Sequence, residues 1–154
     1  MARAIRKNEI ELEFPADMEY IPLIRKLVSE IMAVNEFSPK YAYRAEIIAD
    51  EICMNAVKFG SPRLESRIVF RCSVFPERVE MTIKDEGGAP ENLARLRRVI
   101  ETMDTEEVRS DAAKTRGRGL EIVRMLANGV DMKVDSQGLT EIHVIKYRQD
   151  TEGK

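Results

Sequence analysis

Cysteine and histidine are scarce in this sequence, which has two cysteines and one histidine among 154 residues. The two thiols, Cys53 and Cys72, are too few and too far apart for a zinc site. Both occupy apolar positions of a periodic pattern, so we expect buried free thiols, as in a reducing cytoplasm. His143 alternates outwards on a predicted strand, and we expect it to be a surface residue rather than a catalyst.

Net charge and long apolar runs are also lacking. The formal net charge is only -2, which argues against a dedicated nucleic-acid binder. No apolar segment is long enough to span a membrane. The basic residues at the start are not followed by the apolar stretch that is typical of a signal peptide. We therefore expect a cytoplasmic protein with no membrane partner and no direct nucleic-acid partner. The length suits a single domain over residues 1–154, because such a chain buries roughly 70% of its unfolded surface.

Hydrophobic periodicity predicts an α+β fold, a two-layer sandwich whose antiparallel or mixed sheet has helices on one face. Alternating apolar residues predict five strands, around 10–14, 68–74, 79–83, 130–134 and 142–145. Apolar residues three and four apart predict helices over 18–32, 38–59 and 117–127. The hydrophobic periodicity is lost over 91–116, where we expect one short helix and then a mobile loop.

Glu51 and Asn55 are four residues apart in a predicted helix and therefore share a face. An asparagine carbonyl oxygen is a suitable ligand for Mg²⁺ among phosphate oxygens. A glutamate can orient or deprotonate a nucleophile. Taken alone, the pair is more typical of a solvated glutamate and a surface asparagine than of a catalytic site.

Asp85 has the same strand parity as Val79, Met81 and Ile83, so its carboxylate should point to the core. A buried carboxylate needs a donor, and the exocyclic amino group of adenine is one. The alternative is an aspartate that caps the turn at Gly87.

Gly117 and Gly119 open a predicted helix, whose bare amides and positive end can bind an anion. Lys114, Arg116 and Arg118 add positive charge that suits a triphosphate; the alternative is a flexible basic loop. Further on, Thr140 shares strand parity with inward-facing residues, so its hydroxyl should face the same pocket.

The order of these motifs resembles the GHKL (Bergerat-fold) ATPases, and within them the bacterial anti-sigma factor serine kinases. Asp50–Val57 is similar to the N-box of that family, and Lys84–Gly87 to its adenine-binding box. Arg116–Val123 is similar to its last glycine box, and Gly138–Thr140 to its Gly-Thr before the final strand. The resemblance covers nearly the whole chain.

The resemblance implies a role for each matched residue. Glu51 would be the catalytic base and Asn55 the magnesium ligand, while Asp85, Gly87 and Thr140 would form the adenine site. Residues 91–116 would be the lid over ATP. The phosphate end would be formed by Lys114, Arg116, Gly117, Gly119 and Leu120.

The family also implies partners: an anti-anti-sigma (STAS-type) protein, whose serine is phosphorylated, and a sigma factor that is sequestered. Arg25 stands in a similar place to a family arginine used for partner contact. The long apolar first helix is compatible with a homodimer.

Two departures and three alternatives qualify this interpretation. Ala89 replaces the second glycine of the adenine box, and Phe59 stands where a histidine is common after the N-box. A non-catalytic module of the same fold would sequester its partner without turnover, but would have no use for Glu51 and Asn55. The catalytic domain of a sensor histidine kinase would need a phosphoacceptor helix pair. A topoisomerase or chaperone relative would need a transducer domain. We expect neither in this chain.

Overall fold

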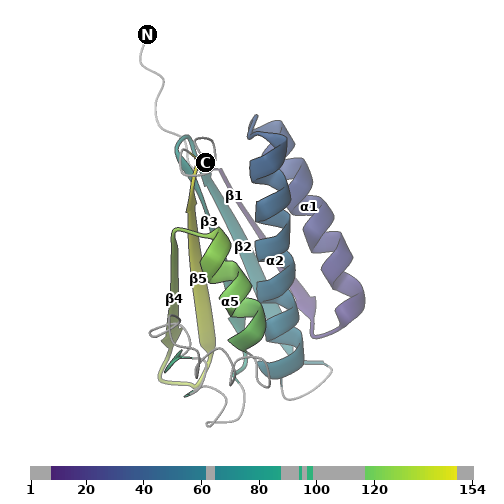
Figure 1. Ribbon diagram of the computed structural model, residues 1–154. Coiled ribbons are helices and arrows are strands. Elements are labelled where there is room, and N and C mark those ends of the chain that lie inside the picture. The colour runs from purple at the N-terminus through teal and green to yellow at the C-terminus, as the bar shows by residue number, and fades with distance from the viewer. Residues whose placement is uncertain (1–7, 62–64, 88–93, 95–96, 99–116, 149–154) are drawn as a thin grey trace.

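The structure, a computed structural model, describes residues 8–61, 65–87, 94, 97–98 and 117–148 (Figure 1). The chain begins with a strand and two main helices, continues with a hairpin, and ends with a helix and a second hairpin. In order, the elements are β1 (Asn8–Pro15), the 3-10 helix η1 (Met18–Tyr20), α1 (Ile21–Val34), α2 (Pro39–Phe59), β2 (Arg67–Phe75), β3 (Arg78–Asp85), α5 (Gly117–Leu126), β4 (Gly129–Val134) and β5 (Thr140–Tyr147).

The five strands form one sheet in the order β1-β2-β3-β5-β4. Each strand is antiparallel to its neighbours, so the sheet contains no parallel pair among the described residues. The helices α1, α2 and α5 lie against one face of the sheet (Figure 1). The predicted two-layer α+β sandwich is therefore confirmed, with the antiparallel arrangement of its sheet.

Helix α2 forms where its sequence predicts, and its caps explain why. The Ser38 hydroxyl accepts a hydrogen bond from the Tyr41 N–H at 3.1 Å, and Pro39 occupies the first turn, where a missing N–H costs nothing. At the other end the Gly60 N–H bonds to the Ala56 oxygen at 3.0 Å. The predicted apolar stripe of this helix is fully buried: Ala45, Ile48, Ile52 and Ala56.

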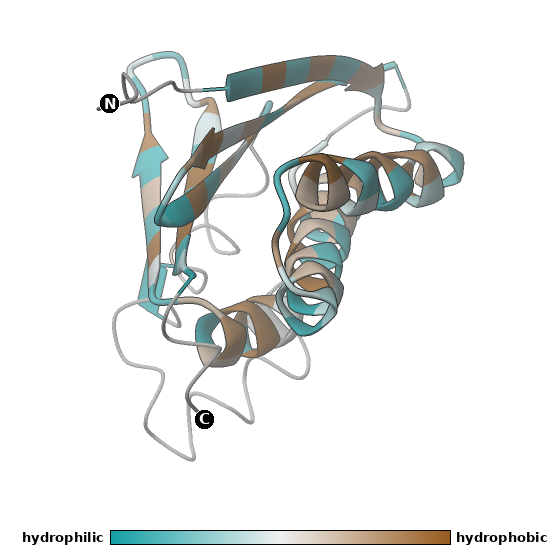
Figure 2. Ribbon diagram, turned by 90° about the horizontal axis from the view of Figure 1, so that it is seen from above, coloured by the Kyte–Doolittle hydropathy of each residue, from teal (hydrophilic) through white to brown (hydrophobic). Residues whose placement is uncertain are grey.

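The core lies between the helices and the sheet, and hydrophobic and hydrophilic bands alternate along the strands (Figure 2). Cys53 and Cys72 are both buried and free, as expected. Burial raises the pKa of both thiols, and Asp50 raises that of Cys53 further. The pKa of Cys72 rises to about 12, so both groups remain protonated and inert at neutral pH.

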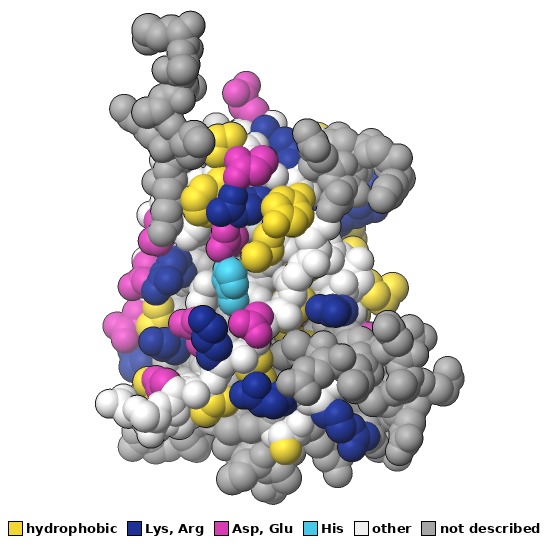
Figure 3. All heavy atoms as spheres, turned by 90° about the vertical axis from the view of Figure 1, so that its left-hand side faces the viewer, with side chains coloured by type: hydrophobic (Ala, Val, Ile, Leu, Met, Phe, Trp, Pro, Cys, Tyr) yellow, Lys and Arg dark blue, Asp and Glu magenta, His cyan; other side chains and the backbone are white. Residues whose placement is uncertain are grey.

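The other face of the sheet is covered by charged side chains, with His143 among them (Figure 3). The His143 Nε2 lies 2.8 Å from Glu80 Oε1, and Glu80 Oε2 accepts a hydrogen bond from Arg78 at 2.6 Å. Partial burial favours protonation of Glu80, but the hydrogen bonds from Arg78 and His143 outweigh it and lower its pKa. His143 is one-third exposed, which confirms its prediction as a surface residue.

The segment between β3 and α5 is described at three positions only. Residues 94, 97 and 98 are helical, and the four apolar residues of the predicted short helix, Leu93, Leu96, Val99 and Ile100, lie outside the described residues. The lid over 91–116 therefore stays a prediction. None of the helices that the structure describes is both long enough and apolar enough to cross a membrane.

Candidate nucleotide site

Most of the predicted nucleotide-site residues that the structure describes meet at one end of the molecule. The last turn of α2, the end of β3 and the beginnings of α5 and β5 all lie at the lower end in Figure 1. Helix α5 packs against α2, and β3 pairs with β5. The fold thus brings together segments that are up to 90 residues apart in the chain, from Glu51 on α2 to Thr140 on β5.

Asp85 ends β3 with its carboxylate in the interior, and only 1% of the residue is exposed. Its Oδ1 accepts a hydrogen bond from the Gly87 N–H at 2.8 Å. The core-facing carboxylate and the turn-capping aspartate, which the sequence left as alternatives, are therefore both present in the same side chain. Gly87 has a φ of 85°, a conformation that favours glycine.

Thr140 is paired in register with Asp85 and is fully buried. Its Oγ1 has no hydrogen-bond partner among the described residues. Gly87 passes close by: a β-carbon added to it would lie 3.7 Å from this oxygen and 2.5 Å from the Gly138 carbonyl oxygen. A buried hydroxyl without a protein partner costs stability, so this position suits a polar ligand.

Glu51 and Asn55 lie on the face of α2 that meets the beginning of α5. Asn55 is buried, with 4% of the residue exposed, and Glu51 is partly exposed. A β-carbon added to Gly119 would overlap Glu51 Oε2 and lie 3.4 Å from its Cδ. The glutamate carboxylate is therefore packed directly against the backbone of the first turn of α5.

The start of α5 has the features of an anion site. The helix begins at Gly117, and the first four N–H groups of any α-helix lack partners within the helix. Leu120 is fully buried and anchors this turn in the core. The positive end of the helix therefore lies beside Glu51, which would face any anion bound there.

A comparison of the sequence with known families decides the classification. A family model described as the histidine kinase-like ATPase domain matches residues 14–146. The chain belongs to this ATPase family.

Two named relatives with similar sequences are protein kinases. The chain is 29% identical over 143 residues to a serine-protein kinase RsbW of Staphylococcus epidermidis, covering 92% of this chain and 87% of the relative. A serine-protein kinase RsbW of Bacillus licheniformis is 26% identical over 129 residues, covering 82% of this chain and 79% of the relative.

Two solved structures share the fold. One contains the RsbU and RsbW domains of Rv1364c from Mycobacterium tuberculosis, with a TM-score of 0.63 and 13% identity over 90% of this chain and 32% of that chain. The other is the SiaB–SiaC complex from Pseudomonas aeruginosa, with a TM-score of 0.70 and 10% identity over 88% of each chain. At this identity they support the ATPase fold alone.

An adenine nucleotide fits the observed donor and acceptor set of this ATPase domain. A buried carboxylate and the orphaned Thr140 hydroxyl are suited to a purine edge, and the first turn of α5 to phosphates. Within the described residues, no group of three or more His, Cys, Asp or Glu side chains is arranged to hold a metal. The Asn55 side chain offers an amide oxygen, a ligand type that suits a magnesium ion among phosphate oxygens.

Some predicted residues lie away from this end or outside the described part of the chain. Lys114 and Arg116 fall in the segment that is not described, so their placement stays a prediction. Arg25 lies on α1, where its Nη1 is 3.7 Å from Asp50 Oδ1 and its side chain is 48% exposed. It is therefore a surface residue next to the N-box segment, not part of the nucleotide pocket.

The sequence did not predict the tertiary contacts of two residues near this site. Gly60, which directly follows the predicted helix 38–59, lies against the Asp85 carboxylate. Glu86 joins the ends of two strands: Oε1 accepts from the Ser66 hydroxyl and Oε2 from the Arg67 N–H, both at 3.0 Å. Neither contact follows from local spacing, because Gly60 and Asp85 are 25 positions apart and Glu86 lies 20 and 19 positions from Ser66 and Arg67.

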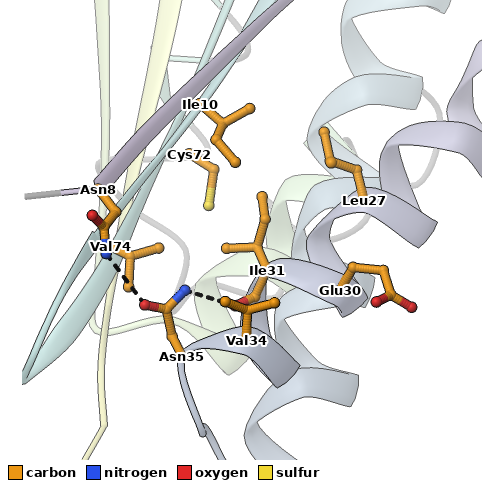
Figure 4. A pocket seen from close by; sticks show the side chains of 9 residues that line it. All are labelled: Asn8, Ile10, Leu27, Glu30, Ile31, Val34, Asn35, Cys72 and Val74. Carbon is orange, nitrogen blue, oxygen red and sulfur yellow. Dashed lines mark hydrogen bonds between the residues drawn. The ribbon is translucent and has the colours of Figure 1, made fainter.

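A separate groove of about 450 Å³ lies between β1, β2 and α1, near the opposite end of the molecule from Asp85 (Figures 1 and 4). Its lining is mostly apolar, and at one end Asn8 donates a hydrogen bond to Asn35 at 3.4 Å. Among the described residues, none of the predicted nucleotide ligands lines it. The groove is therefore distinct from the candidate ATP site.

Proposed function

We propose that this protein is an ATP-dependent protein serine kinase and anti-sigma factor, which phosphorylates an anti-anti-sigma (STAS-type) protein and sequesters a sigma factor. The observation that carries the proposal is the contact of the Glu51 carboxylate with the first turn of α5 at Gly119. A base beside an anion site is what transfer of a phosphoryl group to a hydroxyl requires. The named RsbW relatives support the serine-kinase assignment.

The adenine end of the site is formed by Asp85, Gly87 and Thr140. The Asp85 carboxylate accepts a hydrogen bond from the exocyclic amino group, and the buried Thr140 hydroxyl bonds to a ring nitrogen or to an ordered water on the base. Gly87 lets the backbone pass close to both side chains, because its added β-carbon would meet the Gly138 carbonyl oxygen at 2.5 Å.

The phosphate end is formed by the first turn of α5. The backbone N–H groups at Gly117 and Gly119 bind phosphate oxygens, and Leu120 holds the turn in the core. Lys114 and Arg116 belong to the proposed lid of residues 91–116 and add positive charge. Asn55 would provide a side-chain oxygen to a magnesium ion that accompanies the nucleotide.

Bound ATP supplies the activated phosphoryl group, and Glu51 supplies the base. Glu51 orients the serine hydroxyl of the partner and accepts its proton as the new oxygen–phosphorus bond forms. The bond between the terminal phosphorus and its bridging oxygen breaks, and ADP is the leaving group. Because the transition state is stabilised mainly by position and charge, the fixed contact between α2 and α5 matters as much as the base itself.

The partner surfaces are proposed from α1. Arg25 is half-exposed and is held by Asp50, which directly precedes Glu51, so a partner bound to it would be close to the catalytic end. The exposed apolar side chains of Leu23 and Val34 on the same helix suit a homodimer contact. A sigma factor as partner implies a cytoplasmic location.

The proposal is tested by phosphate transfer from labelled ATP to a candidate anti-anti-sigma protein. Glu51→Gln should keep ATP and partner binding yet lose transfer by on the order of 10²–10⁴-fold, the usual contribution of a general base. Glu46→Gln, on the same helix, is the matched control and should transfer normally. Wild-type transfer by Glu51→Gln would refute the role of Glu51. Tight partner binding by a wild-type protein that transfers no phosphate would favour the non-catalytic module instead.

A further inference from the structure

We infer that Gly60 is a positioning residue for the adenine-binding carboxylate and that the size of the residue at this position sets the preference for adenine nucleotides. The inference rests on the proposed function, because it assigns Asp85 to the adenine base. Gly60 follows the last residue of α2 and is buried. Its neighbour across the interior is the carboxylate of Asp85, at the end of β3.

The backbone does not explain why this position is glycine. Gly60 has φ -102° and ψ 8°, a conformation open to any residue. Gly87 and Gly138 differ in this respect, with φ values of 85° and 83°. The Gly60 N–H also makes an ordinary helix-ending bond to the Ala56 oxygen at 3.0 Å. A side chain at position 60 is therefore excluded by its surroundings rather than by strain.

The atoms nearest to such a side chain belong to the Asp85 carboxylate. A β-carbon on Gly60 would lie 2.7 Å from Oδ1 and would overlap Oδ2 and Cγ outright. Observed β-carbon contacts essentially never fall below 3.0 Å, so the carboxylate would have to move. All three of the nearest atoms belong to this single side chain.

Asp85 has little freedom to move. The residue is 1% exposed, and its Oδ1 is held by the Gly87 N–H at 2.8 Å. An aspartate reaches its carboxylate through only two torsions, so a rotation that clears Gly60 also changes the direction of both oxygens. The proposed acceptor for the base would then be withdrawn or turned away, while the fold around it persists.

The consequence is a change in nucleotide preference as well as in affinity. Adenine presents an amino donor at the position where guanine presents a carbonyl acceptor. A well-placed carboxylate favours the first and repels the second. Displacing the carboxylate removes both effects, so affinity for ATP should fall while affinity for GTP changes less.

The test is a double-mutant cycle of Gly60→Ala and Asp85→Ala, with ATP, ADP and GTP affinities measured by calorimetry and melting temperatures measured in parallel. Gly129→Ala is the matched control, because a β-carbon there meets nothing within 4 Å. Gly60→Ala should weaken ATP and ADP binding about tenfold or more, the value of a hydrogen bond to a charged group. The ratio of ATP to GTP affinity should fall, and Gly129→Ala should match the wild type.

In the Asp85→Ala background the same Gly60→Ala change should alter neither nucleotide affinity nor melting temperature, because the clashing carboxylate is gone. An equal loss in both backgrounds would overturn the inference, and so would wild-type affinity and selectivity in Gly60→Ala. A wild-type protein that binds no adenine nucleotide would overturn the proposed function instead. In that case the melting temperatures still test the steric contact, since Gly60→Ala should destabilise only the protein that retains Asp85.

Discussion

Replacing Thr140 with valine should stabilise the ligand-free protein and weaken its affinity for ATP. The Thr140 hydroxyl is fully buried, and its Oγ1 has no hydrogen-bond partner among the described residues. Valine keeps the branched shape, the β-strand preference and the burial, and removes only the polar atom. The substitution therefore separates two effects of the hydroxyl: its cost to the stability of the ligand-free protein and its contribution to ATP affinity.

The magnitudes follow from the burial of this oxygen. Leaving a buried hydroxyl unsatisfied costs about 1–3 kcal/mol, so Thr140→Val should raise the free energy of unfolding of the ligand-free protein by about 1 kcal/mol or more. If ATP satisfies the hydroxyl, the variant loses a hydrogen bond with a net value of about 0.5–1.5 kcal/mol. This loss corresponds to roughly a two- to tenfold weaker affinity for ATP.

Urea denaturation with and without saturating ATP measures both effects, since ligand binding adds to the free energy of unfolding. Thr82→Val is the control: Thr82 is on the neighbouring strand β3 but on the charged face of the sheet, opposite His143 in register. The control should leave the affinity for ATP unchanged. A Thr140→Val protein that is less stable without ligand would show that the hydroxyl is satisfied in the empty fold, and one that binds ATP with wild-type affinity would show that this hydroxyl is not the adenine contact.

Three further outcomes are expected. Ser38→Ala should lower the free energy of unfolding by about 1 kcal/mol in chemical denaturation, through loss of the α2 N-cap. Glu80→Gln should lower the free energy of unfolding at pH 7. Arg78 and His143 lower the pKa of Glu80 against its partial burial, so the difference in stability between the variant and the wild type should disappear as pH falls below about 4. A thiol reagent at pH 8 should modify neither cysteine of the native protein and both cysteines of the unfolded protein. Burial raises the pKa of Cys72 to about 12 and also raises the pKa of Cys53. Rapid modification of the native protein would contradict this prediction.

The helices and strands could be predicted closely, because their signals are local. Ser38 and Pro39 start α2 and Gly60 ends it, and these residues act within one turn of the helix ends. The start of the first helix is also set locally. Its apolar period begins at Met18, but the Asp17 carboxylate accepts the Glu19 N–H, so a 3-10 turn forms first. Helix α1 then begins at Ile21, with Pro22 in its first turn, where proline is tolerated.

Strand parity predicted that Asp85 and Thr140 face the interior, and both are buried. Parity alone could not place them opposite each other, because the pairing register of β3 and β5 depends on a long connection between them. The role of Gly60 was likewise out of reach. Its contact with Asp85 joins segments 25 positions apart, and the same Gly-Ser-Pro sequence is a sufficient helix terminator without any contact.

Helix α2 holds both ends of the site in one rigid element. Near its middle, Glu51 packs against Gly119 at the proposed phosphate end, and just after its last residue Gly60 packs against Asp85 at the proposed adenine end. Nine residues separate these two contacts, which corresponds to about 13 Å along the helix axis. A ligand that uses both must be elongated, with a base at one end and an anion at the other. Because the stripe of α2 between the contacts is fully buried, the spacing cannot adjust without repacking the core, and it suits the proposed nucleotide that carries a chain of phosphates.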